Sequence, residues 1–217
     1  MIIELTTQEL DRCIEFSYKC AKNQQEIEFG QSDTIPRSHI EIGRDNLIGK
    51  IAEVAFSKMM DKYFGIMIAL DFEYYPRGVW DKQDAIINGW RIDVKGTRQG
   101  GRWMLIEWSK LNFRQKEGIL SHLYVMSSVN WDRVKDLPTG KVDIVGCASL
   151  DRLVHGVKNT LILRKGSCIP KTNTRLQADN FGIHFDNLEH DWNKVIHWIT
   201  NNPPFDTSGY PNPYNVF

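Results

Sequence analysis

Three charged side chains lie close together in the sequence, with residue types that suit chemistry at a phosphate. Asp84, Asp93 and Lys95 belong to the segment DKQDAIINGWRIDVKGT, which covers residues 81–97. Two carboxylates that face one another supply the oxygen ligands that a hard cation such as Mg²⁺ prefers. An ammonium beside them can orient an attacking water or balance the charge of a phosphate. These residues predict metal-assisted hydrolysis, provided that the chain brings them together.

The pair Asn88-Gly89 predicts the element that brings them together. It lies between two apolar runs, which is the strongest short-range signal of a two-residue hairpin turn. With this turn, Asp84 faces Asp93 across the hairpin, and the side chain of Lys95 lies on the same face. Opposed carboxylates repel unless a cation or a shared proton compensates. The other face of the hairpin is apolar and consists of Ala85, Ile87, Trp90, Ile92 and Val94.

A longer hairpin loop would make a different residue the first acid. Asp81 lies three positions before Asp84 and is the competing candidate. The register set by a two-residue turn favours Asp84.

A helix expected from about residue 45 to about residue 63 carries a further acid. Glu53 falls at the edge of its apolar stripe, where a carboxylate can reach a pocket without being sealed in the core. A glutamate in such a position is more often a surface residue, so its role depends on the hairpin. The stripe consists of Leu47, Ile48, Ile51, Ala52, Ala55, Phe56, Met59 and Tyr63.

Together these segments resemble the PD-(D/E)XK superfamily of metal-dependent nucleases. The resemblance rests on Asp84, on the run Asp93-Val94-Lys95, and on the upstream run Gly49-Lys50-Ile51-Ala52-Glu53. Gln83 stands where the motif has proline, a departure that the superfamily tolerates. The resemblance covers roughly residues 42–157 and is specific at the hairpin.

The resemblance implies a Mg²⁺-dependent phosphodiesterase, a deoxyribonuclease that acts as an endonuclease on DNA. Glu53, Asp84, Asp93 and Lys95 are then the expected catalytic residues. Asp84, Asp93, Glu53 and the backbone carbonyl of Val94 are the expected metal ligands, and Mn²⁺ is expected to substitute for Mg²⁺. Water would displace the 3′-oxygen in line and leave a 5′-phosphate.

The balanced charge of the chain means that any attraction to nucleic acid is local. The 27 basic and 27 acidic side chains give a formal charge of zero. Residues 91–116 hold seven basic and two acidic side chains, a surplus of five positive charges. Counterion release at such a segment supplies much of the non-specific affinity for DNA. The candidates for nucleic-acid binding are Arg91, Arg98, Arg102, Lys110 and Arg114.

Two other functions stay open at this point. One is a catalytically silent protein on the same fold, which binds nucleic acid or acts as a scaffold. The presence of both acids and the lysine argues against it. The other is a nuclease that acts on RNA or on branched DNA, which neither the charge count nor the motif separates from a nuclease acting on DNA.

The remaining sequence pattern predicts an α/β fold, with a mixed central sheet flanked by helices, a helical N-terminus and an irregular C-terminal tail. We expect one nuclease domain over residues 1–217, made of an N-terminal helix and loop (1–40), a catalytic core (41–157) and a C-terminal extension (158–217). Helices are expected at about 7–22, 45–63, 150–154 and 188–199, and strands at about 66–75, 103–108, 123–129 and 142–147.

Composition also predicts the surroundings in which the protein works. The four cysteines have no C-x-x-C spacing, and we expect free thiols in a reducing compartment. The chain has no secretory pattern at its start and no run of about 18 apolar residues, so we expect a cytoplasmic protein without membrane association. The sequence leaves a homodimer open.

Overall fold

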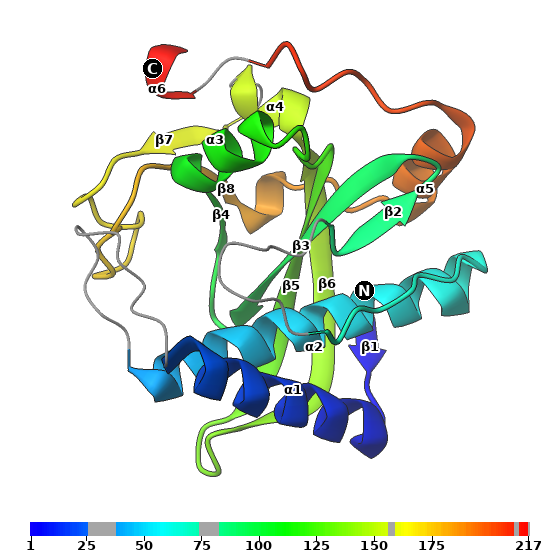
Figure 1. The fold of residues 1–217 in the computed structure, drawn as a ribbon, viewed down its shortest axis with the longest axis vertical. Coiled ribbons are helices and arrows are strands. Elements are labelled where there is room, and N and C mark those ends of the chain that lie inside the picture. The colour runs from blue at the N-terminus through cyan, green and yellow to red at the C-terminus, as the bar shows by residue number, and fades with distance from the viewer. Residues whose placement is uncertain (26–37, 74–82, 156–158, 211–212, 217) are drawn as a thin grey trace. The chain divides into compact units, whose positions relative to one another are not determined.

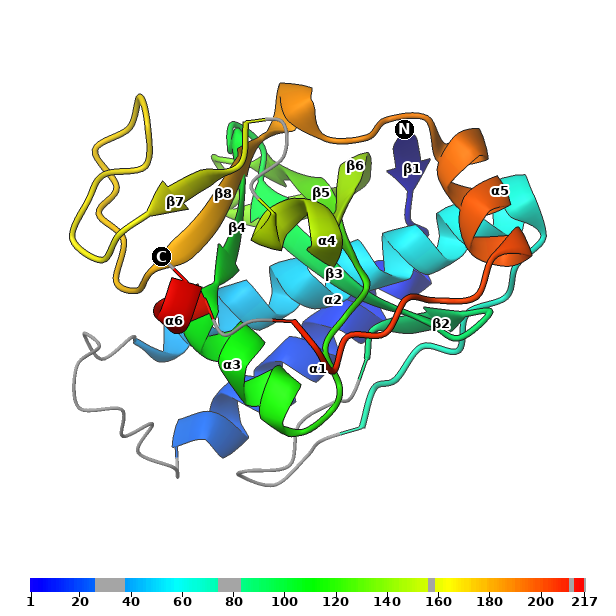
Figure 2. The same cartoon turned by 90° about the horizontal axis from the view of Figure 1, so that it is seen from above.

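The computed structural model describes residues 1–25, 38–73, 83–155, 159–210 and 213–216. The described residues form an α/β fold with two sheets and flanking helices (Figures 1 and 2). The larger sheet is mixed and has the strand order β1-β6-β5-β3-β2, and the smaller one has the order β4-β8-β7. The predicted fold class is confirmed.

The elements have the following bounds. The strands are β1 (Ile2–Glu4), β2 (Ala85–Ile87), β3 (Trp90–Arg98), β4 (Trp103–Glu107), β5 (Leu123–Asp132), β6 (Leu137–Ser149), β7 (Leu161–Leu163) and β8 (Asn180–His184). The helices are α1 (Thr7–Gln25), α2 (His39–Phe64), α3 (Trp108–Lys116), α4 (Leu150–Val154), α5 (Trp192–Asn201) and α6 (Pro213–Val216), with a 3₁₀ turn at Phe185–Asn187.

The chain divides into two compact units. The first contains Met1–Ala85, Val94–Gly101 and Met126–Ile144, and the second contains Ile86–Asp93, Arg102–Val125 and Val145–Phe217. Strands β3, β5 and β6 pass from one unit into the other along the chain. The expectation of one nuclease domain in three consecutive parts stays a prediction.

Helices α1 and α2 lie side by side in the first unit (Figure 1). The Thr6 N–H donates to the Glu9 carboxylate at 2.6 Å, and the Glu9 N–H donates to the Thr6 hydroxyl at 3.2 Å, so a capping box precedes α1, which begins where the sequence predicts. Helix α2 begins six residues earlier than expected, because Ser38 and Glu41 form a second capping box. It ends at Phe64, because the next residue, Gly65, adopts a left-handed conformation (φ 64°) that terminates the helix.

Helix α2 also packs closely against strand β3 within the first unit. A Cβ atom at Gly96 would lie 2.8 Å from the carbonyl oxygen of Ile48 and 3.2 Å from the Cβ of Ala52. Only glycine leaves room for a helix backbone this close to the strand. The position of Glu53, next to Ala52, is thereby brought near the position of Lys95, next to Gly96.

The predicted hairpin turn is confirmed. Asn88 (φ 47°) and Gly89 (φ 80°) both have positive φ, as a two-residue type I′ turn requires. Ile86, which points to the other face, is exposed. The side chains of the predicted apolar face are all 5% exposed or less: Ala85, Ile87, Trp90, Ile92 and Val94.

The second unit contains the three-stranded sheet and four of the helices. Strand β4 pairs antiparallel with β8, which in turn pairs antiparallel with β7. Helix α3 follows β4 directly and contacts α6. Helix α4 begins where the sequence predicts, because the Ser149 hydroxyl accepts from the Arg152 N–H at 3.2 Å.

The strand predicted over residues 66–75 is wrong for residues 66–73, which have no regular structure. Side chains of α2 bind backbone carbonyls of this segment instead of a neighbouring strand. The Ser57 hydroxyl donates to the Ile68 carbonyl at 3.1 Å, and the Lys50 ammonium donates to the Asp71 carbonyl at 2.7 Å. Residues 74 and 75 lie outside the described part of the chain.

Replacement of Gly96 by alanine tests the close approach of α2 to β3. We expect Gly96→Ala to lower the free energy of unfolding by about 1–3 kcal/mol, because the new methyl group overlaps the helix backbone. The matched control is Gly49→Ala on helix α2, at a position where an added Cβ meets nothing within 4 Å. This control is expected to stabilise the protein by roughly 0.5–1 kcal/mol. Urea unfolding followed by circular dichroism measures both, and equal effects would contradict the contact.

Candidate active site

Asp84 is held against the strand that carries the other hairpin charges. Its carboxylate accepts a hydrogen bond from the Val94 N–H at 2.6 Å. Val94 lies between Asp93 and Lys95 in the chain. This bond therefore connects Asp84 to the backbone between the other two charged residues of the motif. Asp84 and Lys95 are both half-buried, which leaves them partly accessible to a ligand.

Glu53 is held by Lys50, a buried residue of the same helix that the sequence pattern did not predict as its partner. The Lys50 ammonium donates to the Glu53 carboxylate and to the Asp71 carbonyl. It also lies 4.6 Å from the ring centroid of Phe16 and 5.2 Å from that of Phe72. The Lys50 side chain is 4% exposed and the Glu53 side chain 15%, so Glu53 lies at the edge of the core as expected. The sequence signal for this ion pair is that Lys50 and Glu53 lie three positions apart on one helix, a spacing at which side chains are neighbours.

Asp93 has a guanidinium partner in the second unit. The residue is 3% exposed, and its carboxylate oxygen lies 3.2 Å from Nη1 of Arg114. The same nitrogen donates to the hydroxyl of Ser121 at 3.0 Å. Burial raises the pKa of the nearby Tyr124 hydroxyl, and the negative charge of Asp93 raises it further. Asp93 therefore belongs to a buried polar cluster with Arg114, Ser121 and Tyr124.

The hairpin residues are of the types that bind a hard cation. Asp84 in the first unit and Asp93 in the second each carry carboxylate oxygens, and Val94 carries a backbone carbonyl. Mg²⁺ keeps several waters and usually takes only one or two carboxylates from a protein. Within the described ranges, no three or more His, Cys, Asp or Glu side chains gather as a metal site. The alternative acid Asp81 lies outside the described residues.

The other basic candidates differ in what they contact. Arg98 lies 3.4 Å from the carboxylate of Asp136, and its guanidinium stacks 4.0 Å from the ring centroid of Trp131. Arg102 and Lys110 are exposed. Their roles in binding nucleic acid stay predictions.

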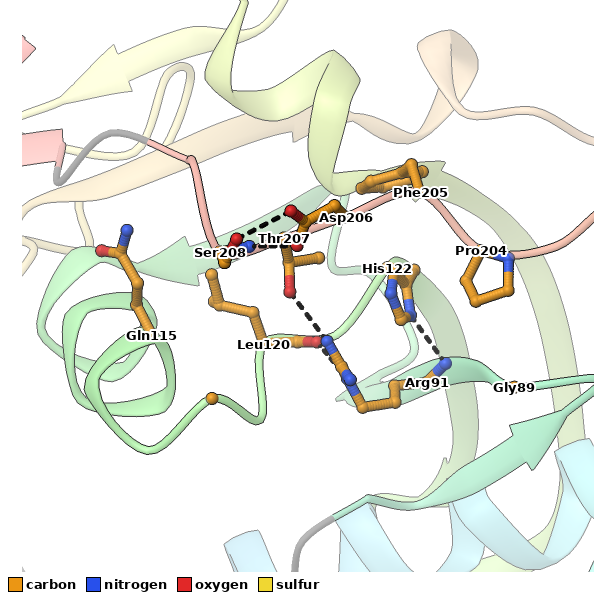
Figure 3. A pocket seen from close by; sticks show the side chains of 11 residues that line it. Gly89, Arg91, Gln115, Leu120, His122, Pro204, Phe205, Asp206, Thr207 and Ser208 are labelled. Atoms are coloured by element: carbon orange, nitrogen blue, oxygen red, sulfur yellow. Dashed lines mark hydrogen bonds between the residues drawn. The ribbon is translucent and has the colours of Figure 1, made fainter.

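Arg91 lies in the wall of a cavity of about 340 Å³ in the second unit (Figure 3). Its guanidinium donates to the Leu120 carbonyl at 2.6 Å and to the Thr207 hydroxyl at 2.8 Å. Residues 204–208 of the C-terminal segment also line this cavity. The bond to Thr207 joins the hairpin strand to the C-terminal segment, for which the sequence predicts an irregular tail.

His122 strengthens this connection and was not a candidate from the sequence, because no motif surrounds it. It is 2% exposed, and its Nδ1 accepts from the Arg91 N–H at 2.9 Å. Its ring contacts the ring of Phe205, with the centroids 5.2 Å apart. Burial, together with the positive charge of Arg91, lowers the pKa of His122 to about 4.

Compared with known protein families, with curated proteins and with solved structures, the chain finds no match. No helix in the described part of the chain combines the length and the apolar character that crossing a bilayer requires.

The low pKa of His122 predicts a loss of stability in mild acid. The imidazole has a pKa of about 4 in the folded protein and about 6.5 in the unfolded chain, so protons bind the unfolded state preferentially as the pH falls. The free energy of unfolding should be fully retained above pH 6.5 and should drop by about 3 kcal/mol between pH 6.5 and pH 4.

The variant His122→Asn provides the control for this prediction. Asparagine keeps an acceptor for the Arg91 N–H but does not titrate. Urea unfolding at pH 7.5, 6.5, 5.5 and 5.0 should show a smaller pH dependence in the variant than in the wild type. The same pH dependence in both proteins would contradict the assignment to His122.

Proposed function

We propose that this protein is a metal-dependent DNA nuclease that hydrolyses phosphodiester bonds with Mg²⁺ and acts as an endonuclease. The observation that carries the proposal is the 2.6 Å hydrogen bond from the Val94 N–H to the Asp84 carboxylate. This bond connects Asp84, the first acid of the motif, to the backbone of the run Asp93-Val94-Lys95, which supplies the second acid and the lysine. The close approach of α2 to β3 at Gly96 supports the inclusion of Glu53.

Each residue has a distinct role in the proposed reaction. Asp84 and Asp93 would hold the metal through carboxylate oxygens, with the Val94 carbonyl as a further ligand. Glu53 would complete the ligand set or hold a water beside it. The metal, when bound, stabilises the charge that develops on the attacked phosphate. Lys95 orients the attacking water and offsets negative charge beside it.

The resting charges of the site agree with these roles. Glu53 is paired with Lys50, and Asp93 is paired with Arg114. Each carboxylate therefore has a basic side chain beside it when no metal is bound. The four cysteines are free, which supports the expectation of a reducing compartment such as the cytoplasm.

Substitution of the motif residues tests the proposal. We expect Asp84→Asn, Asp93→Asn and Lys95→Met each to reduce Mg²⁺-dependent cleavage of DNA by roughly 10²-fold or more, because each removes a metal ligand or the group that positions the water. Asparagine at position 84 keeps an acceptor for the Val94 N–H. Gel assays with supercoiled, linear, single-stranded and branched DNA and with RNA, in Mg²⁺, Mn²⁺ or EDTA, measure the activity and its substrate.

Two exposed residues supply matched controls. Asp61→Asn on α2 and Lys135→Met between β5 and β6 remove the same charges at exposed positions. Both are expected to cleave like the wild type. Cleavage that survives in folded Asp93→Asn and Lys95→Met, or that persists in EDTA, would reject the proposed function.

A further inference from the structure

In the second unit, a guanidinium group already lies against the carboxylate of Asp93. The Arg114 guanidinium lies 3.2 Å from it and also donates to Ser121 at 3.0 Å. Ser121 is fully buried and Asp93 is 3% exposed. Because the hydroxyl of a buried residue fixes the guanidinium, this pair has a defined geometry, unlike most ion pairs on a protein surface.

The surroundings make a counter-ion necessary for Asp93. Tyr124 is 1% exposed. Burial raises the pKa of its hydroxyl, and the negative charge of Asp93 nearby raises it further. A carboxylate in such a poorly hydrated place is strongly destabilising when no positive charge accompanies it. Asp93 therefore needs positive charge beside it, which the guanidinium or a metal ion can supply.

The two cations compete for one carboxylate. A divalent ion on Asp93 adds two positive charges next to the guanidinium, and the repulsion is strong where water is scarce. Arg114 must then move to another partner. The planar fork of a guanidinium matches two phosphate oxygens as well as it matches a carboxylate.

We propose that Arg114 is an exchangeable counter-ion, which binds Asp93 in the free protein and turns to a phosphate of the nucleic acid when a metal ion binds Asp93. This inference rests on the proposed nuclease function. The exchange makes metal binding and nucleic-acid binding mutually favourable, and each ligand raises the affinity of the other by the same factor. The metal site is then completed chiefly on the substrate, which limits binding of metal to the free protein.

Calorimetric titration with Mg²⁺ in the absence of nucleic acid tests the exchange. We expect Arg114→Met to bind Mg²⁺ at least tenfold more tightly than the wild type, because the competing cation is gone. The matched control is Lys116→Met, which removes an exposed positive charge two residues away on the same helix. Its Mg²⁺ affinity should stay within twofold of the wild type. A folded Arg114→Met protein with wild-type Mg²⁺ affinity would overturn the inference.

Binding of DNA supplies a second readout that does not depend on cleavage. Fluorescence anisotropy of a short duplex, with and without Ca²⁺, measures the coupling between the two ligands. In the wild type and in Lys116→Met, Ca²⁺ should raise the affinity for the duplex at least fivefold. In Arg114→Met this increase should be lost, and an undiminished increase would contradict the exchange.

Thermal melting in EDTA and in Mg²⁺ covers the case in which the variant folds poorly. Arg114→Met that is unfolded in EDTA but folded in Mg²⁺ supports the exchange, since the metal then replaces the guanidinium. A variant that is unfolded in both overturns it. If neither the wild type nor Arg114→Met binds Mg²⁺ and neither cleaves DNA, the proposed function fails too. Wild-type binding that depends on Asp93 but not on Arg114 rejects the exchange alone.

Discussion

The contact of helix α2 with strand β3 at Gly96 is the constraint on which the candidate site depends. A single added methyl group at this position would lie 2.8 Å from a backbone oxygen of the helix. The contact therefore requires the smallest residue on the strand and a small one, Ala52, on the helix. Ala52 and Gly96 are the chain neighbours of Glu53 and Lys95. Their close packing therefore also fixes the backbone positions from which the side chains of Glu53 and Lys95 extend.

The charges of the site are held by internal partners. Glu53 has Lys50, Asp93 has Arg114, and Asp84 has a backbone N–H. Buried or half-buried ions are tolerated when opposite charges and hydrogen bonds compensate for lost hydration. Each acid of the site thus has a polar or basic partner within the protein. Under the proposed function, a metal ion would exchange with these partners.

Local patterns predicted the hairpin and the starts of α1 and α4, but they placed the start of α2 six residues too late and that of α5 four residues too early. The Asn88-Gly89 turn and the buried alternation around it follow from two-residue periodicity and turn chemistry. By contrast, the pairing of Asp93 with Arg114 joins residues 21 positions apart on different elements, and no periodicity encodes it. The strand expected over residues 66–75 does not form over residues 66–73, where side chains of α2 bind two backbone carbonyls in place of a neighbouring strand. Sequence spacing cannot show such competition.

The central claim is that the hairpin acids bind a metal ion, and a crystal structure with Mn²⁺ tests it most directly. Anomalous scattering locates Mn²⁺ without reference to the protein atoms. The account predicts a peak about 2.1 Å from a carboxylate oxygen of Asp84 and from one of Asp93, a distance typical of Mg²⁺-type sites, with Arg114 moved off Asp93 when DNA is bound. A well-ordered crystal in which Mn²⁺ binds elsewhere, while Asp84 and Asp93 keep their present partners, would contradict it.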